Sequence, residues 1–309
     1  MSVGEPLDRA AALLQRDCGS RLRMGLPLAP LTSFRIGGPA ALYLEPRDDA
    51  DLFAAGRTVQ ETGIPFVVLG KGSNVLVSDA GFPGLVIRLG QAYRWAAREG
   101  RFLSAGGAMP LPAHAGVALR HALAGIEFGV AIPASLGGAA RMNAGAHGRQ
   151  MADVIDSIDL VRLLEAGRGT VEASDVGFAY RRTHLPPDAV VVGARLRLEP
   201  GQPVDIRAAM DDAREWRRRT QPVAEPNCGS VFKNPEGDHA ARLIDESGLK
   251  GTAVGGAQVS GKHANFIVTS SGAQAADVLA LIHLLQDQVH ARTGIRLEPE
   301  VQFVGAFDA

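Results

Sequence analysis

The chain has 309 residues, 46% of them hydrophobic, so it can bury a sizeable core and form two or three compact units. Its 32 basic and 33 acidic residues give a formal net charge of -1 without long like-charge runs, which argues against nucleic acid and anionic membrane as partners. The two cysteines, Cys18 and Cys228, lie far apart and form no CxxC motif, so we expect no disulfide framework and no cysteine-based metal site. A reducing cytoplasm fits this usage.

The first part of the chain predicts a helix at residues 6–17, a strand at 41–45, a capped helix at 48–63 and a buried strand at 65–70. The N-terminal stretch alternates charged and apolar residues and therefore lacks the apolar core of a secretory signal. Further predicted elements are strands at 75–78, 84–89, 93–99 and 101–107 and a helix at 110–125.

The second part predicts strands at 154–164, 170–173 and 190–200, with an irregular segment at 178–187. A charged helix at 205–220 is the expected connector into a smaller C-terminal unit. That unit is predicted to contain a helix at 239–248, a strand at 265–270, a helix at 273–293 and a closing strand at 296–305. Glycine, proline or charge interrupts every apolar run before about 18 residues, so we expect no membrane span.

Glycine-rich loops are the most informative feature of the chain, which contains 37 glycines. GKGSN, at 70–74, directly follows a predicted strand, and IPASLGGAARMNAGAHG, at 132–148, has few side chains bulky enough to pack. Such loops can present backbone N–H groups to phosphate, although a tight turn is the simpler interpretation of GKGSN alone. Neither loop matches GxGxxG, and GAQVSGKH at 256–263 has His263 where a P-loop requires Ser or Thr.

Ser230 stands out because NCGSVFKNP, at 227–235, sets one hydroxyl close to a cation and an amide. Ser230 and Lys233 have the spacing of S-x-x-K acyl-transfer enzymes, but Pro235 argues against the helix that this motif needs. Phe232 breaks the G-x-S-x-G pattern as well, so Ser230 is not a convincing nucleophile.

Other polar residues have plain interpretations when they are taken alone. His114 and His121 lie seven apart on a predicted apolar helix, which indicates packing or rim positions and no metal site. Glu298 and Glu300 would point the same way on the closing strand, and Arg181 would by default lie at the surface.

The ordered set of segments resembles one family, the UDP-N-acetylenolpyruvoylglucosamine reductases (MurB). The motifs run between residues 32 and 305, and they are TSFRIGGPA, LGKGSNVLVSD, IPASLGGAARMNAGAHG, AYRRTH, EPNCGSVFKNP, ARLIDESGLKG, GGAQVSGKHANFIV and LEPEVQFVG. The resemblance implies an α+β fold, with a two-part FAD-binding domain of the vanillyl-alcohol-oxidase (PCMH) type at 1–200 and a smaller α/β substrate-binding domain at 201–309. The chain resembles the shorter form of the family, which lacks a longer substrate-covering insertion.

The resemblance also implies a non-covalent FAD held by the two glycine-rich loops. Three positions depart from the usual family pattern: Ala134 replaces a common glycine, His147 a frequent tyrosine and Thr183 a common serine. Ala134 would weaken flavin binding if the backbone there needs a positive φ. The implied flavin residues are Gly70, Gly72, Ser73, Asn74, Ser135, Gly137, Gly138, Asn143 and Gly145.

The implied reaction has two halves: NADPH reduces FAD, and reduced FAD passes hydride to C3 of the enolpyruvyl group of UDP-N-acetylglucosamine enolpyruvate. By the same resemblance Ser230 is the general acid that protonates C2, while Arg181 and Glu300 polarise the carboxylate and stabilise the enolate. Glu300 helps the developing charge only if it is protonated. Lys233 and Asn234 either assist Ser230 or bind the substrate diphosphate.

Two alternatives remain beside this hypothesis. The first is another flavin oxidase or dehydrogenase on the same fold, because a fold does not fix its substrate. A flavin- or UDP-sugar-binding protein without catalysis is the second, and the presence of Ser230, Arg181 and Glu300 argues against it. The implied partners are small molecules, with no nucleic acid and no membrane, and the sequence leaves the oligomeric state open.

Overall fold

The computed structural model of the chain describes residues 4–307 and divides into two compact units. Unit 1 consists of residues 4–25, 41–71 and 84–215, and unit 2 of residues 26–40, 72–83 and 216–307. These units differ from the two continuous domains that the sequence predicts, whose boundary at residue 200 stays a prediction. No helix among the described residues is long and apolar enough to cross a membrane.

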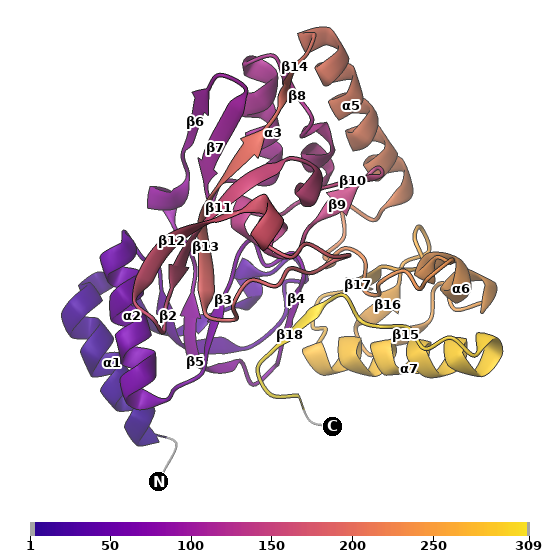
Figure 1. Cartoon of the computed structure of the whole chain (residues 1–309). Helices are drawn as coiled ribbons and strands as arrows, with labels where there is room; N and C mark the ends of the chain where they lie inside the picture. The colour runs from indigo at the N-terminus through magenta and orange to yellow at the C-terminus, as the bar shows by residue number, and fades with distance from the viewer. Residues whose placement is uncertain (1–3, 308–309) are drawn as a thin grey trace. The chain divides into compact units, whose positions relative to one another are not determined.

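Unit 1 contains most of a four-stranded sheet flanked by two helices, α1 (Gly4–Cys18) and α2 (Asp49–Thr62), which lie side by side (Figure 1). The helix α2 begins and ends as its sequence predicts, because Asp48 accepts a hydrogen bond from the Asp51 N–H and Gly63 adopts the left-handed conformation, with φ of +69°. The strand order is β1 (Leu22–Pro27), β2 (Pro39–Leu44), β5 (Phe82–Ile87) and β3 (Phe66–Val68).

Unit 1 also contains a five-stranded antiparallel sheet (Figure 1). A separate cluster of buried apolar side chains forms the core of this part. Helices α3 (Leu111–Arg120), α4 (Leu136–Arg141) and α5 (Pro203–Thr220) contribute to that core. The strand order is β12 (Gly167–Glu172), β11 (Ile155–Arg162), β13 (Ala189–Arg197), β7 (Phe102–Gly106) and β6 (Ala96–Glu99). Short pairs join β8 (Leu123–Ala124) to β14 (Glu199–Pro200) and β9 (Gly145–Ala146) to β10 (Arg149–Gln150).

Two predictions within unit 1 are refined by the structure. The helix expected at 110–125 ends at Arg120, because Ala122 and Gly125 both adopt positive φ and cannot continue it. His114, on the inner face of α3, is fully buried, whereas His121 at the end of the helix is exposed. The connector helix α5 extends across the unit boundary, which falls between Glu215 and Trp216.

Unit 2 combines an antiparallel sheet of β15 (Ala253–Val254), β16 (Ala257–Val259) and β17 (Ile267–Thr269) with two helices, α6 (Ala240–Glu246) and α7 (Ala275–Thr293). Phe34 and Leu76, from the two N-terminal segments of this unit, belong to its core.

The closing strand of unit 2 is shorter than predicted. Only β18 (Gln302–Val304) forms, in a parallel pair with β4 (Val75–Val77), whereas the sequence predicts a strand over 296–305. The remaining described helices are short 3₁₀ turns: η1 (Gly19–Arg21), η2 (Ala29–Leu31), η3 (Gln91–Tyr93), η4 (Glu127–Ala131), η5 (Met151–Asp153) and η6 (Ala173–Asp175).

Candidate active site

The GKGSN loop has the backbone of an anion-binding turn. Among the described residues, no N–H of residues 70–74 donates a hydrogen bond to any group of the protein. Gly72 has φ of +66°, and a Cβ there would lie 2.1 Å from the Leu31 carbonyl oxygen, so only glycine fits. This run of donors is available to an anionic ligand, and it suits the phosphates of a dinucleotide such as FAD.

The second glycine-rich loop lies beside Gly70, a residue of the first loop that belongs to unit 1. A Cβ on Gly70 would lie 2.7 Å from Ser135 Oγ, which itself accepts a hydrogen bond from the Gly138 N–H at the start of α4. Gly137 packs against the main chain, since a Cβ there would approach the Val191 carbonyl oxygen to 2.8 Å. Gly145 is likewise confined by the Arg149 carbonyl oxygen, at 2.5 Å. The glycines of this loop therefore allow close packing of the protein's own backbone.

Ala134 and Asn143 show how that loop tolerates its side chains. Ala134 is absent from the residues with positive φ, so the alanine that departs from the family pattern introduces no backbone strain. Asn143 does adopt φ of +43° and is 1% exposed. Its amide donates to Gln150 Oε1 and to the Ala179 carbonyl oxygen, both at 3.0 Å, and its Oδ1 accepts from the Ala152 N–H at 2.9 Å. Both donors of the side chain are thus engaged within the protein.

The segment that carries Arg181 is fastened to the same loop. The Arg141 guanidinium donates to the Pro186 carbonyl oxygen at 2.8 Å and to that of Ala189 at 3.2 Å. The Thr183 hydroxyl donates to the Arg141 carbonyl oxygen at 2.9 Å, so the threonine that replaces a common serine makes a hydroxyl hydrogen bond. Burial lowers the pKa of Arg141.

Arg181 itself occupies the corner of a tight hairpin. Ala179 and Arg182 exchange both main-chain hydrogen bonds, at 3.0 and 3.3 Å, and Arg181 adopts φ of +57°, where glycine or asparagine is usual. Its guanidinium carbon lies 5.4 Å from the centroid of the Tyr180 ring. A half-buried arginine in a strained conformation is a candidate functional residue, because such strain concentrates at functional sites.

Ser230 lies in a turn that ends in two buried residues of unit 2. Asn227 Oδ1 accepts from the Gly229 N–H at 2.9 Å, and Gly229 has φ of +81°. Ser230 is half-buried, and its hydroxyl makes no hydrogen bond within the described chain. The segment from 229 to 236 contains no helix, which removes the setting that an S-x-x-K motif requires.

Glu300 is brought next to the Ser230 segment by main-chain pairing. The Glu300 N–H donates to the Val231 carbonyl oxygen at 2.7 Å, and the Lys233 N–H donates to that of Glu298 at 2.9 Å. The amide of Asn74, from the GKGSN loop, donates to the Glu300 carbonyl oxygen at 3.1 Å. One network thus joins three predicted site segments of unit 2.

The buried thiol of Cys228 lies within the electrostatic influence of the Glu300 carboxylate. Burial raises the pKa of Cys228, and the negative charge of Glu300 raises it further. Ser230 and Glu300 therefore belong to one assembled region of unit 2, whereas Arg181 belongs to unit 1.

The two predicted substrate-binding residues have partners within unit 2. The Lys233 ammonium forms an ion pair with Glu298, and Asn234 Oδ1 accepts from the Ala240 N–H at the start of α6, at 3.1 Å. Neither side chain hydrogen-bonds Ser230 in the described structure. Their roles toward a substrate stay predictions.

Sequence reasoning missed Asn265. This residue is 4% exposed and bonds both main-chain polar groups of Phe232, two residues after Ser230. A signal was present, since an asparagine two residues before the apolar strand β17, next to Phe266, is a polar residue in an apolar stretch that is expected to be buried.

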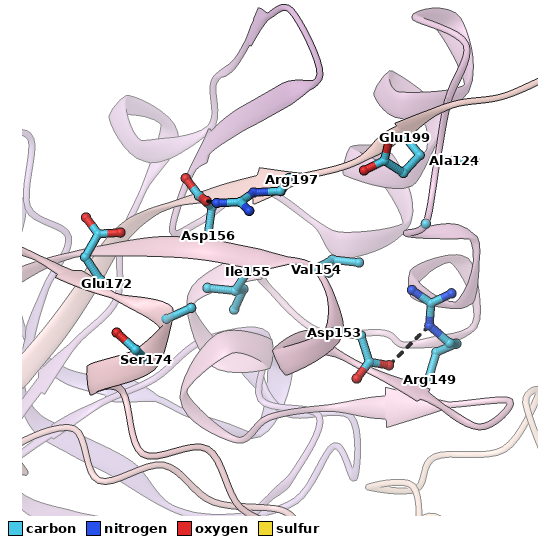
Figure 2. A pocket seen from close by; sticks show the side chains of 12 residues that line it. Ala124, Arg149, Asp153, Val154, Ile155, Asp156, Glu172, Ser174, Arg197 and Glu199 are labelled. Atoms are coloured by element: carbon cyan, nitrogen blue, oxygen red, sulfur yellow. Dashed lines mark hydrogen bonds and ion pairs between the residues drawn. The ribbon is translucent and has the colours of Figure 1, made fainter.

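A pocket of about 450 Å³ lies in unit 1 beyond the glycine-rich loop and contains none of the predicted site residues (Figure 2). Arg149 pairs with Asp153 at 3.1 Å, and Arg197 pairs with Asp156. Both arginines that line the pocket therefore form ion pairs with carboxylates of the same pocket. A second pocket of about 410 Å³ also lies apart from the predicted site. The first is lined by Ala124, Gly125, Arg149, Asp153, Val154, Ile155, Asp156, Glu172, Ala173, Ser174, Arg197 and Glu199.

The P-loop alternative for residues 256–263 fails on its structural setting. These residues form β16 and the turn into its antiparallel neighbour β17, whereas a P-loop connects a strand to a helix.

Comparison with known proteins identifies two family models in the chain. An FAD binding domain matches residues 40–173, and the UDP-N-acetylenolpyruvoylglucosamine reductase C-terminal domain matches residues 221–304. A reductase of that name from Anaeromyxobacter sp. (strain Fw109-5) is 45% identical over 307 residues, which cover 98% of this chain and 94% of the relative. The Heliobacterium modesticaldum protein of the same name is 44% identical, covering 94% and 93%.

Solved structures agree with the sequence comparison. The crystal structure of MurB from Thermus caldophilus has a TM-score of 0.80 and 35% identity, and covers 92% of this chain and 98% of that one. Phl p 4.0202, a glucose dehydrogenase, shares the fold alone, with a TM-score of 0.50, 12% identity, and coverage of 93% and 63%. These findings confirm the predicted α+β fold, with an FAD-binding part of the PCMH type, and FAD as the cofactor. The chain therefore belongs to the UDP-N-acetylenolpyruvoylglucosamine reductase (MurB) family, the flavin-dependent oxidoreductases of peptidoglycan precursor synthesis.

Proposed function

We propose that this chain catalyses the NADPH-dependent reduction of UDP-N-acetylglucosamine enolpyruvate to UDP-N-acetylmuramate in the cytoplasm. The observation that carries the proposal is the main-chain pairing of the Ser230 and Glu300 segments, because it sets a hydroxyl and a carboxyl group in one region of unit 2. Both cysteines are buried free thiols, which fits a reducing compartment. The domains of 1–200 and 201–309 would bind the flavin and the substrate, respectively.

Bound non-covalently, FAD would accept hydride from NADPH and supply it to C3 of the enolpyruvyl group. The N–H groups of residues 70–74 are proposed to hold its pyrophosphate, since they have no partner within the described protein. Ser135, Gly137, Gly138 and Gly145 would shape the adjoining wall, and Asn143 would support the loop through its bonds to the protein.

The proton and charge steps are assigned to three side chains. Negative charge develops at C2 and on the adjoining carboxylate once C3 has received hydride. The Arg181 guanidinium would stabilise that charge, and a protonated Glu300 would do so as a hydrogen-bond donor. The Ser230 hydroxyl would donate its proton to C2, completing the reduced product. Lys233 and Asn234 are proposed to contact the substrate diphosphate.

The test separates the two half-reactions in Ser230→Ala, with Ser270→Ala as the matched control. Ser270 is an exposed serine of unit 2 that donates only to the Gly256 carbonyl oxygen. In Ser230→Ala, NADPH should reduce the flavin at nearly the normal rate, while reoxidation by UDP-N-acetylglucosamine enolpyruvate should slow by about 10²-fold or more. Ser270→Ala should leave both rates unchanged.

Each alternative predicts a different outcome of the same stopped-flow experiment. Normal reoxidation of Ser230→Ala would favour another flavin oxidoreductase activity on this fold. Reduction of the wild-type flavin by NADPH without any turnover of the enolpyruvyl substrate would favour a binding protein. Equal slowing of both halves in Ser230→Ala would sink the assignment of Ser230 as the acid.

A further inference from the structure

We infer that Asn265 is the residue that positions Ser230 for proton transfer; this inference rests on the proposed function. Asn265 lies in the turn before β17 and is 4% exposed. Nothing in the described structure brings its side chain to solvent, so its amide acts within the protein.

Asn265 clamps the two residues that follow Ser230. Its Oδ1 accepts from the Phe232 N–H at 2.9 Å, and its Nδ2 donates to the Phe232 carbonyl oxygen at 2.8 Å. Its own carbonyl oxygen accepts from the Val231 N–H at 2.9 Å. Val231 and Phe232 are each 1% exposed, so these main-chain groups have no access to water and depend on Asn265.

This clamp determines where the Ser230 hydroxyl lies. Because that hydroxyl makes no hydrogen bond among the described residues, its position is fixed by the backbone on either side. The Asn227 turn holds the preceding residue, Gly229. On the other side the Asn265 side chain holds Phe232, in addition to the main-chain bond between the Glu300 N–H and the Val231 carbonyl oxygen. Loss of the Asn265 amide frees Phe232 and lets the serine shift by a fraction of an ångström, which is enough to impair a proton transfer that needs hydrogen-bond distance.

An amide is the side chain that this position requires. Asparagine offers one acceptor and one donor in a single plane, matching the N–H and C=O of one residue. Leucine keeps a similar volume and loses both hydrogen bonds. An ionised aspartate keeps the acceptor, loses the donor and places a negative charge against the Phe232 carbonyl oxygen, whereas a protonated aspartate restores the donor.

The first experiment compares Asn265→Leu with Asp277→Ala, a variant that removes two hydrogen bonds elsewhere in unit 2. Asp277 accepts from the Gly256 and Gln274 N–H groups, at 2.9 and 3.0 Å. Both variants should lower the Tm by several degrees. In Asn265→Leu, reoxidation by the enolpyruvyl substrate should slow by about 10²-fold with flavin reduction by NADPH preserved. Asp277→Ala should preserve both rates, and equal effects of the two variants would overturn the inference.

A double-mutant cycle distinguishes positioning from general destabilisation. If Asn265 acts through the Ser230 hydroxyl, adding Asn265→Leu to Ser230→Ala should slow reoxidation no further. Additive slowing would show that Asn265 acts independently of Ser230 and would overturn the inference. Normal reoxidation in Ser230→Ala alone would instead refute the proposed acid, so the two failures are distinguishable.

The isosteric variant Asn265→Asp supplies a test that does not depend on folding of the leucine variant. Its reoxidation rate, relative to wild type at the same pH, should rise as the pH falls, because protonation returns the donor to the Phe232 carbonyl oxygen. A purely structural role predicts a ratio that does not change with pH while the protein stays folded. A flat ratio across the folded range would therefore contradict the positioning role.

Discussion

Replacing Arg181 with glycine should separate the stability of its hairpin from its function. Arg181 has φ of +57° at the corner of the turn closed by Ala179 and Arg182. An L-residue in this conformation costs about 1–2 kcal/mol, which glycine avoids. Glycine lowers the free energy of unfolding by about 0.4–1 kcal/mol, because it gives the unfolded chain more conformational entropy. Loss of the contact with the Tyr180 ring lowers it by roughly 0.5–1 kcal/mol more. These three contributions nearly cancel one another.

The neighbouring variant Arg182→Gly is the matched control. Arg182 is exposed and does not adopt a positive φ, so its replacement carries the entropic cost of glycine without relief of strain. Arg181→Ala isolates the strain, because it loses the same side-chain contacts as Arg181→Gly but keeps a Cβ at a positive φ. Arg181→Gly should therefore be more stable than Arg181→Ala by about 1–2 kcal/mol of relieved strain, diminished by the roughly 0.4–1 kcal/mol that glycine costs through the unfolded chain. Urea unfolding of these two variants measures the difference directly.

Activity should follow the opposite order. Arg181→Gly should lose about 10²–10³-fold in kcat, as expected when a fixed donor to a developing negative charge is removed, and Arg182→Gly should stay within a few-fold of wild type. An Arg181→Gly protein less stable than Arg181→Ala would refute the strain argument. Comparable turnover of the two variants would refute the catalytic role of Arg181.

Two further predictions concern the flavin loop and the core of unit 1. Gly72→Ala should lower the FAD content of the purified protein, because its Cβ would collide with the Leu31 carbonyl oxygen at a positive φ, whereas Gly116→Ala, in open space on α3, should keep full flavin content. Burial lowers the pKa of His114 to about 4, below its ordinary value of 6.5. The contribution of this neutral histidine to the free energy of unfolding is therefore fully present above pH 6.5 and declines as the pH falls toward 4. Wild type should lose about 2 kcal/mol of unfolding free energy between pH 7 and pH 5 from this group, His114→Leu should lose correspondingly less, and equal losses would contradict the burial argument.

Local signals explain the parts of the fold that the sequence predicts well. The helix α2 begins after Asp48, whose side chain caps its first turn, and ends before Gly63, which adopts the left-handed conformation that ends a helix. Both residue types are visible in the sequence. The closing strand was predicted too long, because residues 298–300 pair with residues 231–233. Neither the hydrophobic periodicity nor the β-propensity of these two segments indicates that they pair, because they lie far apart along the chain.

The candidate site shows the same division between local and long-range information. The GKGSN loop was recognisable from its glycines and its place after a strand. Asn143 was predicted as a flavin residue, and the structure adds the bonds to Ala179 and Ala152 that engage its amide, which only the folded chain reveals. Asn265 was missed because its function depends on Phe232, a residue 33 positions away. Motifs thus propose residues that contact ligands, whereas residues that hold those ligand-contacting residues in place leave a weaker mark in the sequence.

The most direct test of the central claim is the visible spectrum of the purified protein, recorded alone, after anaerobic NADPH, and after addition of UDP-N-acetylglucosamine enolpyruvate. We predict a yellow flavoprotein that NADPH bleaches and whose colour returns with that substrate. A bleached flavin that the enolpyruvyl substrate leaves reduced would contradict the proposed reaction, and a protein that cannot take up FAD would contradict the assignment of the GKGSN loop as well.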